Sequence, residues 1–186
     1  AGLLYPLWFQ LGRGADPLET GLLLLSMSVG TTIALPLAGR LSDRIGGGWV
    51  SLLGSLVTVA STVPFALLPL DAGEWLIQGL LFVRGAGLAG ALTPAVAAAF
   101  AAVTPAQLPD AAAQVNIVNR VGGALGGALF AIVVANGLPH GVAAAFHSAF
   151  WWLIGASTLG VLAAAWLTAA EVSTRRARSA DPLPAA

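Results

Sequence analysis

The sequence contains no cysteine and no lysine, and only 9% of its residues are charged. Without cysteine, the chain can form neither disulfide bonds nor thiolate metal sites. A soluble domain usually carries about a quarter charged residues, which cover its surface. A surface this poor in charge must therefore face something other than water. The formal net charge of zero also argues against a nucleic-acid partner.

What the sequence has instead is apolar length, with 58% hydrophobic residues and a mean hydropathy of +0.87. Crossing the hydrocarbon of a bilayer takes roughly 20 mostly apolar residues. Five stretches meet this length, at about 20–38, 49–70, 75–103, 111–135 and 143–168. These runs are too continuous for the alternating strands of a membrane barrel. The sequence predicts an all-α, polytopic transmembrane bundle surrounded by lipid.

The two ends of the chain differ from the five complete spans. Residues 1–12 read as the end of a further helix whose beginning is cut off, so residues 1–170 form a membrane domain of six helices with the first truncated. Residues 171–186, rich in Arg and Pro, are expected to form a disordered tail. The exclusive use of Arg as the basic residue, with abundant Ala and Gly, indicates a GC-rich genome. A bacterial source is expected.

Arginine near the span ends predicts the orientation in the membrane. Because short breaks force neighbouring spans to run antiparallel, the break at residues 39–48 and the C-terminal end fall on the same side. That side holds five flanking arginines, namely Arg40, Arg44, Arg175, Arg176 and Arg178. The opposite side holds Arg13 alone. The C-terminus is therefore predicted to be cytoplasmic.

The most specific pattern is the break GRLSDRIGGG at residues 39–48. Its glycines allow two helix ends to approach closely, and Asp43 is expected just before the next helix, whose N-terminal dipole favours a carboxylate. Its arginines can bind phosphate headgroups or an acidic partner. The candidate residues are Gly39, Arg40, Asp43, Arg44 and Gly46. An ordinary cytoplasmic turn explains the same residues.

Several polar side chains fall inside predicted spans, namely Arg84, Gln114, Asn116, Asn119 and Arg120. A charge near mid-membrane costs about 3 kcal/mol or more, so it is expected to face a cavity or a partner. Functional and structural roles are equally open for Arg84. Arg120 is interpreted as structural, and the amides as interhelical hydrogen bonds or a cavity lining. Every Asp and Glu lies outside the spans or at their edges, so a proton carrier is expected in the missing part of the protein.

Glycine spacing predicts close contacts between helices. The pairs Gly122 with Gly126 and Gly123 with Gly127 are four residues apart, as in helices whose backbones touch. Residues 85–90 match the G-x-G-x-x-G pattern, but a dinucleotide site needs a preceding strand and a βαβ unit. Inside a long apolar span, this segment is interpreted as a packing and bending element, with Pro94 as a kink.

Three segments, in order along almost the whole chain, resemble motifs of the major facilitator superfamily. Residues 39–46 match its G-x-L-a-D-r-x-G loop signature, although Gly47 and Gly48 replace the basic pair that usually follows. Residues 116–126 are similar to the N-x-x-R-q-x-G-G-a-l-G run of the fourteen-helix drug:proton antiporter branch. Residues 9–21 are similar to that branch's Q-x-x-x-G-x-S-P entry, with Asp16 in place of Ser.

The resemblance implies the C-terminal six-helix half of a proton-coupled multidrug exporter in the plasma membrane. It would work with an N-terminal half, bind no cofactor and export amphipathic small molecules by alternating access. Asp43 would help to lock one state, and the first, second, fourth and fifth helices would face the cavity. A non-transporting membrane scaffold, or an inactive fragment of a truncated transporter gene, stays open as the alternative. An enzyme is not expected, because the two His lie far from any paired carboxylate.

Overall fold

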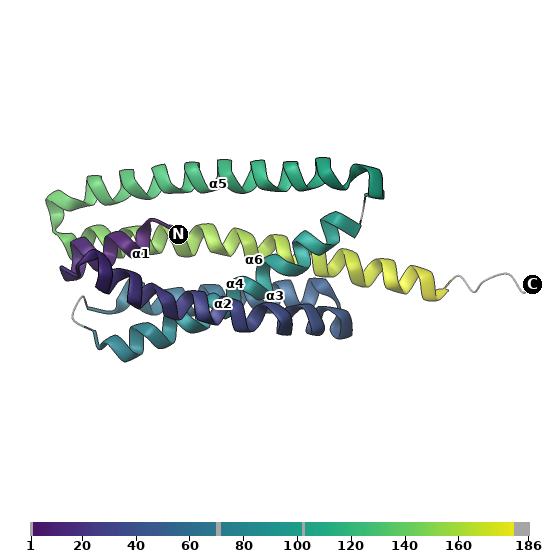
Figure 1. Cartoon of the computed structure of the whole chain (residues 1–186), viewed down its shortest axis with the longest axis horizontal. Helices are drawn as coiled ribbons and strands as arrows, with labels where there is room; N and C mark the ends of the chain where they lie inside the picture. Colours follow the sequence, from purple (N-terminus) through teal and green to yellow (C-terminus); the bar gives the residue numbers. More distant parts are fainter. Residues whose placement is uncertain (1, 70–71, 102, 181–186) are drawn as a thin grey trace, which may run out of the picture.

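Helices of membrane length make up nearly all of the computed structural model, which describes residues 2–69, 72–101 and 103–180 (Figure 1). The described residues contain no strand. The elements are α1 (Leu4–Leu7), the π-helix η1 (Trp8–Gly12), α2 (Pro17–Ile45), α3 (Gly47–Leu67), α4 (Glu74–Ala101), η2 (Pro105–Gln107), α5 (Leu108–Gly137), η3 (Leu138–His140) and α6 (Val142–Ala180). Five candidate spans are long and apolar enough to cross a membrane. The predicted all-α, polytopic class is confirmed.

Local chemistry explains where these helices begin and end. Asp16 caps α2, because its side chain accepts a hydrogen bond of 2.7 Å from the N–H of Glu19, and Pro17 occupies the first helical position. Gly46 ends α2 with a φ of +101°, and Gly141 separates η3 from α6 with a φ of +107°. These φ values are strained for any residue with a Cβ, so glycine allows both reversals.

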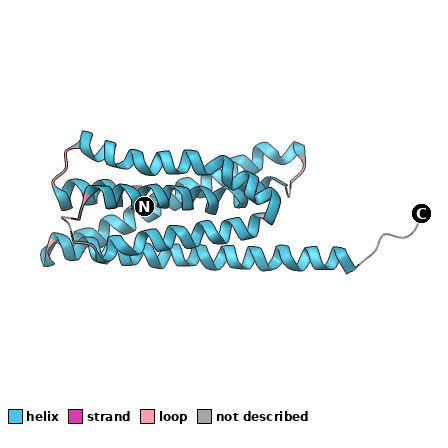
Figure 2. Ribbon diagram, turned by 90° about the horizontal axis from the view of Figure 1, so that it is seen from below, coloured by secondary structure: helices cyan, strands magenta, loops and turns pink. Residues whose placement is uncertain are grey.

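The helices run back and forth, so their connections gather at two ends of the bundle. The C-terminal ends of α3 and α5 lie at one end, and the C-terminal ends of α2 and α4 lie at the other (Figure 1). The C-terminal part of α6 projects from this second end (Figure 2). The arrangement agrees with the predicted alternation of the breaks.

Two helices extend beyond the spans predicted from hydropathy. Helix α2 continues to Ile45 instead of ending near residue 38, because no residue before Gly46 breaks it. Helix α6 continues to Ala180, so residues 171–180 are helical and not disordered. Its 39 residues give a length of about 58 Å, which exceeds a hydrocarbon core of about 30 Å. Residues 181–186, also predicted to be disordered, lie outside the described residues.

Helix α4 packs against both α2 and α3 by close backbone approach. A Cβ added at Gly85 would overlap the carbonyl oxygen of Met27 on α2, and one added at Gly54 on α3 would overlap the backbone of α4 near Ala91. At Gly87, a Cβ would lie 2.9 Å from the backbone nitrogen of Thr58. The interpretation of residues 85–90 as a packing element is confirmed. Pro94 lies inside α4 without ending it.

An aromatic cluster joins the first helix to α3 and α6. The ring of Tyr5 meets that of Phe65 edge-on, with centroids 5.2 Å apart. Phe65 stacks on Phe150 of α6 at 5.5 Å, and Trp8 of η1 meets Phe65 at 5.5 Å. All four side chains are almost fully buried. Such pairs contribute about 0.5–1.5 kcal/mol each beyond the burial of their area, so they hold the short first helix in the bundle.

We predict that Gly85→Ala separates α2 from α4 and destabilises the bundle by about 1–3 kcal/mol, the usual cost of overpacking a core. The matched control is Gly79→Ala on the same helix, because a Cβ at Gly79 has no other atom within 4 Å. Thermal unfolding of the detergent-purified protein, followed by tryptophan fluorescence, measures both variants. Equal melting temperatures for the two variants would contradict this packing.

Candidate functional site

The charged segment predicted as a ten-residue turn is mostly helical. Gly39, Arg40, Asp43 and Arg44 lie on the last two turns of α2, and Gly46 alone separates α2 from α3. The segment is mostly helical because the chain reverses its direction at Gly46. The N–H of Gly46 donates a 2.9 Å hydrogen bond to the carbonyl of Ser42. Asp43 therefore lies at the C-terminal end of a helix, where the dipole disfavours a carboxylate. The expected stabilisation of Asp43 by the next helix is corrected accordingly.

This end of α2 is exposed. The side chains of Arg40, Asp43 and Arg44 all lie on the surface of the described chain, and none of the described residues pairs with them. Close approach is made by Gly47 instead of Gly39: a Cβ at Gly47 would lie 3.2 Å from Cβ of Pro94, whereas a Cβ at Gly39 meets nothing within 4 Å. The charged groups are thus free to bind a partner outside the described chain.

Arg84 is buried at the junction of the first helix, α3 and α4. Its side chain is 4% exposed. Its Nη1 donates to the carbonyl of Thr58 at 3.2 Å and to Oγ1 of Thr62. Its Cζ lies 5.1 Å from the ring centroid of Tyr5, within the range of a cation–π interaction. The described residues thus hold the charge with a carbonyl, a hydroxyl and a ring.

Sequence reasoning missed the partners of Arg84. Two of them, Thr58 and Thr62, belong to a stripe of buried hydroxyl residues on α3, namely Ser51, Ser55, Thr58, Ser61 and Thr62. The hydroxyl residues recur every three or four positions, so they follow one face of the helix. This spacing is visible in the sequence and could have identified the polar face of α3. The stripe shows that the polar face of α3 points into the bundle and receives the cation.

Helix α5 presents its predicted site residues to the outside. Gln114, Asn116, Asn119 and Arg120 are all exposed in the described chain. Asn116 donates a 3.0 Å hydrogen bond from Nδ2 to the carbonyl of Ala112 on its own helix. The expected interhelical bonds are therefore not made by Asn116, and the structural interpretation of Arg120 gains no support from a contact within the described residues.

The glycine pairs of α5 do not touch another helix of the described chain. A Cβ at Gly122, Gly123 or Gly126 would have nothing within 4 Å, and one at Gly127 would meet only Cδ1 of Leu3, at 3.2 Å. The predicted helix–helix contact is therefore not made among the described residues. The reason is that α5 packs against α6 near its other end, where Gly137 approaches Ala145.

Two contacts close the opposite end of the bundle. The guanidinium of Arg13 donates a 2.8 Å hydrogen bond to the carbonyl of Ala72 and lies 5.6 Å from the ring of Trp8. The Nε2 of His147 lies 3.3 Å from the carbonyl of Leu68 at the end of α3. Both contacts connect a side chain to a helix-connecting segment. No group of three potential metal ligands occurs among the described residues.

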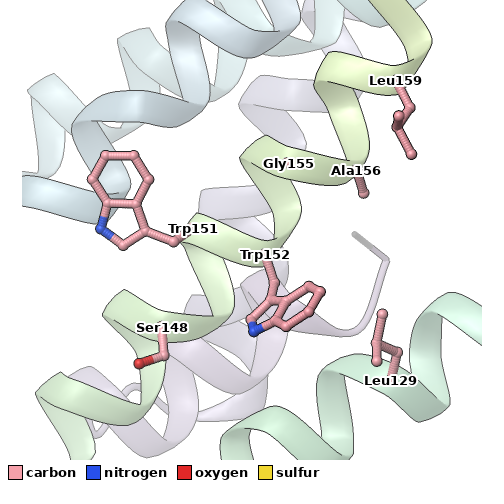
Figure 3. Close-up of a pocket in the computed structure, with 7 residues that line it drawn as sticks. All are labelled: Leu129, Ser148, Trp151, Trp152, Gly155, Ala156 and Leu159. Carbon is pink, nitrogen blue, oxygen red and sulfur yellow. The ribbon is translucent and has the colours of Figure 1, made fainter.

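An apolar groove of about 590 Å³ lies between α5 and α6 (Figure 3). Leu129 comes from α5, and the other lining residues come from α6, namely Ser148, Trp151, Trp152, Gly155, Ala156 and Leu159. The indole of Trp152 extends between the two helices toward Leu129 (Figure 3). The lining has no charged group and a single hydroxyl, so it suits lipid chains and offers little to orient a polar ligand.

Comparison with known proteins covers almost the whole chain. Residues 1–185 match the family described as the Major Facilitator Superfamily. An MFS-type transporter of Bacillus subtilis, YcnB, is 31% identical over 74% of this chain and 29% of its own length. A multidrug resistance protein B homolog of Mycobacterium tuberculosis is 25% identical over 74% of this chain and 26% of its own length. The methylenomycin A resistance protein of Streptomyces coelicolor is 28% identical over 75% of this chain and 30% of its own length.

No solved structure matches the chain. The matched regions amount to less than a third of the length of these relatives. The comparisons therefore concern one part of a transporter-sized protein.

We predict that Thr62→Val destabilises the protein by about 1–3 kcal/mol, because it removes a hydrogen-bond partner from a buried guanidinium. The matched control is Thr32→Val, since Thr32 is exposed and its hydroxyl bonds only the carbonyl of Ser28 on its own helix. Melting temperatures in detergent compare the two variants. An unchanged melting temperature for Thr62→Val would show that Arg84 does not depend on this hydroxyl.

Proposed function

The chain belongs to the Major Facilitator Superfamily, which is a family of membrane transporters and not of enzymes. We propose that it forms the C-terminal portion of a fourteen-helix drug:proton antiporter. The complete protein would export amphipathic small molecules from the cytoplasm by alternating access. The five apolar spans make the chain a multi-pass membrane protein. The relatives' names support an export function, because two of them refer to drug or antibiotic resistance.

The observation that carries this proposal is the open polar face of α5. A helix of 30 residues spans a bilayer, yet Asn116, Asn119 and Arg120 are exposed along it. Polar groups inside a membrane are expensive unless they face a bundle interior or a water-filled cavity. In transporters built from helix repeats, such a cavity lies near the mid-membrane, between two bundles. The open face of α5 fits one wall of it.

Proton coupling and orientation complete the proposal. No Asp or Glu lies in the middle of a described span, so the group that carries the proton is proposed to belong to the rest of the transporter. The end bearing Arg40 and Arg44, from which α6 projects, is proposed to face the cytoplasm of a bacterial cell, in agreement with the positive-inside rule. The other end, with Arg13, faces outward across the plasma membrane.

The segment at the end of α2 is proposed to act as a conformational lock. Asp43 and its neighbouring arginines are exposed and unpaired among the described residues, although they carry both signs of charge within one turn. Such groups can form ion pairs in one state of a transport cycle and release them in the other. The resemblance of residues 39–46 to the family's loop signature supports this role.

Export is tested with the full-length gene that contains this chain. Cells expressing it should accumulate less ethidium than cells with an empty vector, and a protonophore should remove the difference, because the proton gradient would supply the energy. Dye fluorescence in energised cells measures both effects. Absence of protonophore-sensitive export over a broad panel of dyes and antibiotics would refute the proposal and favour a non-transporting membrane scaffold.

We predict that Asp43→Asn lowers the initial rate of export by about fivefold or more, the lower end of typical coupling energies between conformational states. The matched control is Asp110→Asn, because Asp110 is also exposed and lies in the first turn of α5 at the same end of the bundle. Initial export rates, normalised to the amount of protein in the membrane, compare the two variants. Equal rates would remove the locking role of Asp43.

A further inference from the structure

One face of α5 changes its surroundings along the helix. Phe130 and Val134 are buried, and a Cβ at Gly137 would lie 2.6 Å from Cα of Ala145 on α6. Asn116 and Gly123 share this face, because they precede Phe130 by fourteen and seven residues, or about four and two helical turns. Both are exposed. The same face therefore packs on the bundle in one half of the helix and is open in the other.

Arg120 belongs to the open half, close to the centre of the helix. It is the thirteenth of the 30 residues of α5, so it lies about 4 Å from the helix midpoint along the axis. If α5 spans the bilayer symmetrically, this is mid-membrane depth, where transporters bind their substrates. Arg120 is exposed, and none of the described residues bonds or pairs with it. Its charge therefore needs a partner from outside the described residues.

The surroundings of Arg120 provide donors and free space. Asn116 and Asn119 lie one turn or less away, and both side chains are exposed. Gly122, Gly123 and Gly126 follow Asn119 by three, four and seven residues, so they share its face of α5. They leave the backbone bare there, with nothing within 4 Å of where their Cβ atoms would be. A flat apolar group can lie against such a surface, while the guanidinium and the amides donate hydrogen bonds to a polar end.

The sign of the charge limits what binds there. Within the described spans, the ionisable groups near the middle are Arg84 and Arg120, and the described carboxylates lie at or near helix ends. Arg84 is already held by Thr58, Thr62 and Tyr5. This wall of the cavity thus carries one free positive charge and no negative charge to oppose an anion. A planar guanidinium binds a carboxylate with two parallel hydrogen bonds.

We propose that Arg120, with the amides of Asn116 and Asn119, binds the carboxylate of an amphipathic organic acid whose apolar body lies on the glycine surface of α5. This proposal rests on the proposed transport function and adds a class of substrate to it. It also assigns the glycines of α5 a role in substrate contact, in place of the helix contact predicted for them.

The test measures binding separately from export. Full-length protein in detergent is titrated against fluorescein, an aromatic carboxylate, and against ethidium, an aromatic cation, with fluorescence anisotropy as the readout. We expect Arg120→Gln to weaken fluorescein binding by about tenfold or more, since it removes the charge-assisted hydrogen bonds to the carboxylate. Ethidium binding should stay within about twofold, and Arg120→Lys should be intermediate because it keeps the charge without the planar fork.

Leu125→Ala is the matched control, because Leu125 is 67% exposed on the opposite face of α5; its fluorescein affinity should equal that of the unaltered protein. If the unaltered protein does not bind fluorescein, or if Arg120→Gln binds it equally well, the proposal is overturned. If Arg120→Gln instead lowers the melting temperature without weakening fluorescein binding, Arg120 pairs with a carboxylate of the transporter itself. Fluorescein binding without export of any dye would refute the transport function and leave the site in place.

Discussion

Lipid offers no hydrophobic driving force for the association of two apolar helices, so close packing of backbones must hold them together. In this chain that packing occurs where Gly85 and Gly87 of α4 meet α2 and α3. At these positions a single methyl group would collide with backbone atoms, so α2, α3 and α4 form one tightly packed unit. The aromatic cluster around Phe65 then attaches the first helix and α6 to this unit.

Arg84 and Arg120 differ in their proposed roles because they lie differently with respect to this unit. Arg84 lies inside it, where the carbonyl of Thr58 and the hydroxyl of Thr62 replace the water that its charge has lost. Arg120 lies on α5, which packs mainly near its far end and leaves the rest of its inner face open. A buried and satisfied cation stabilises an arrangement of helices, whereas an exposed cation at membrane depth needs a partner of opposite charge. We therefore propose a structural role for Arg84 and a ligand-binding role for Arg120.

The proposed transport cycle uses both parts of this arrangement. A rigid unit of three helices can move as one body, while the open face of α5 would line the proposed cavity through which a substrate passes. The exposed charges around Asp43 lie at the end of α2, so they are attached directly to the rigid unit. Forming or breaking ion pairs at this position would bias the orientation of the whole unit.

Hydropathy and length alone determined the fold class and the five spans, because the thickness of the bilayer sets a local requirement that each segment meets or fails by itself. The motif at residues 39–46 likewise indicated the family from local sequence. Which glycines pack was decided only by the tertiary structure: Gly54 and Gly85 contact neighbouring helices, whereas Gly122 and Gly126 do not. The clearance around a missing Cβ depends on the path of another helix. For the same reason the partners of Arg84 and the openness around Arg120 could not be predicted from the sequence.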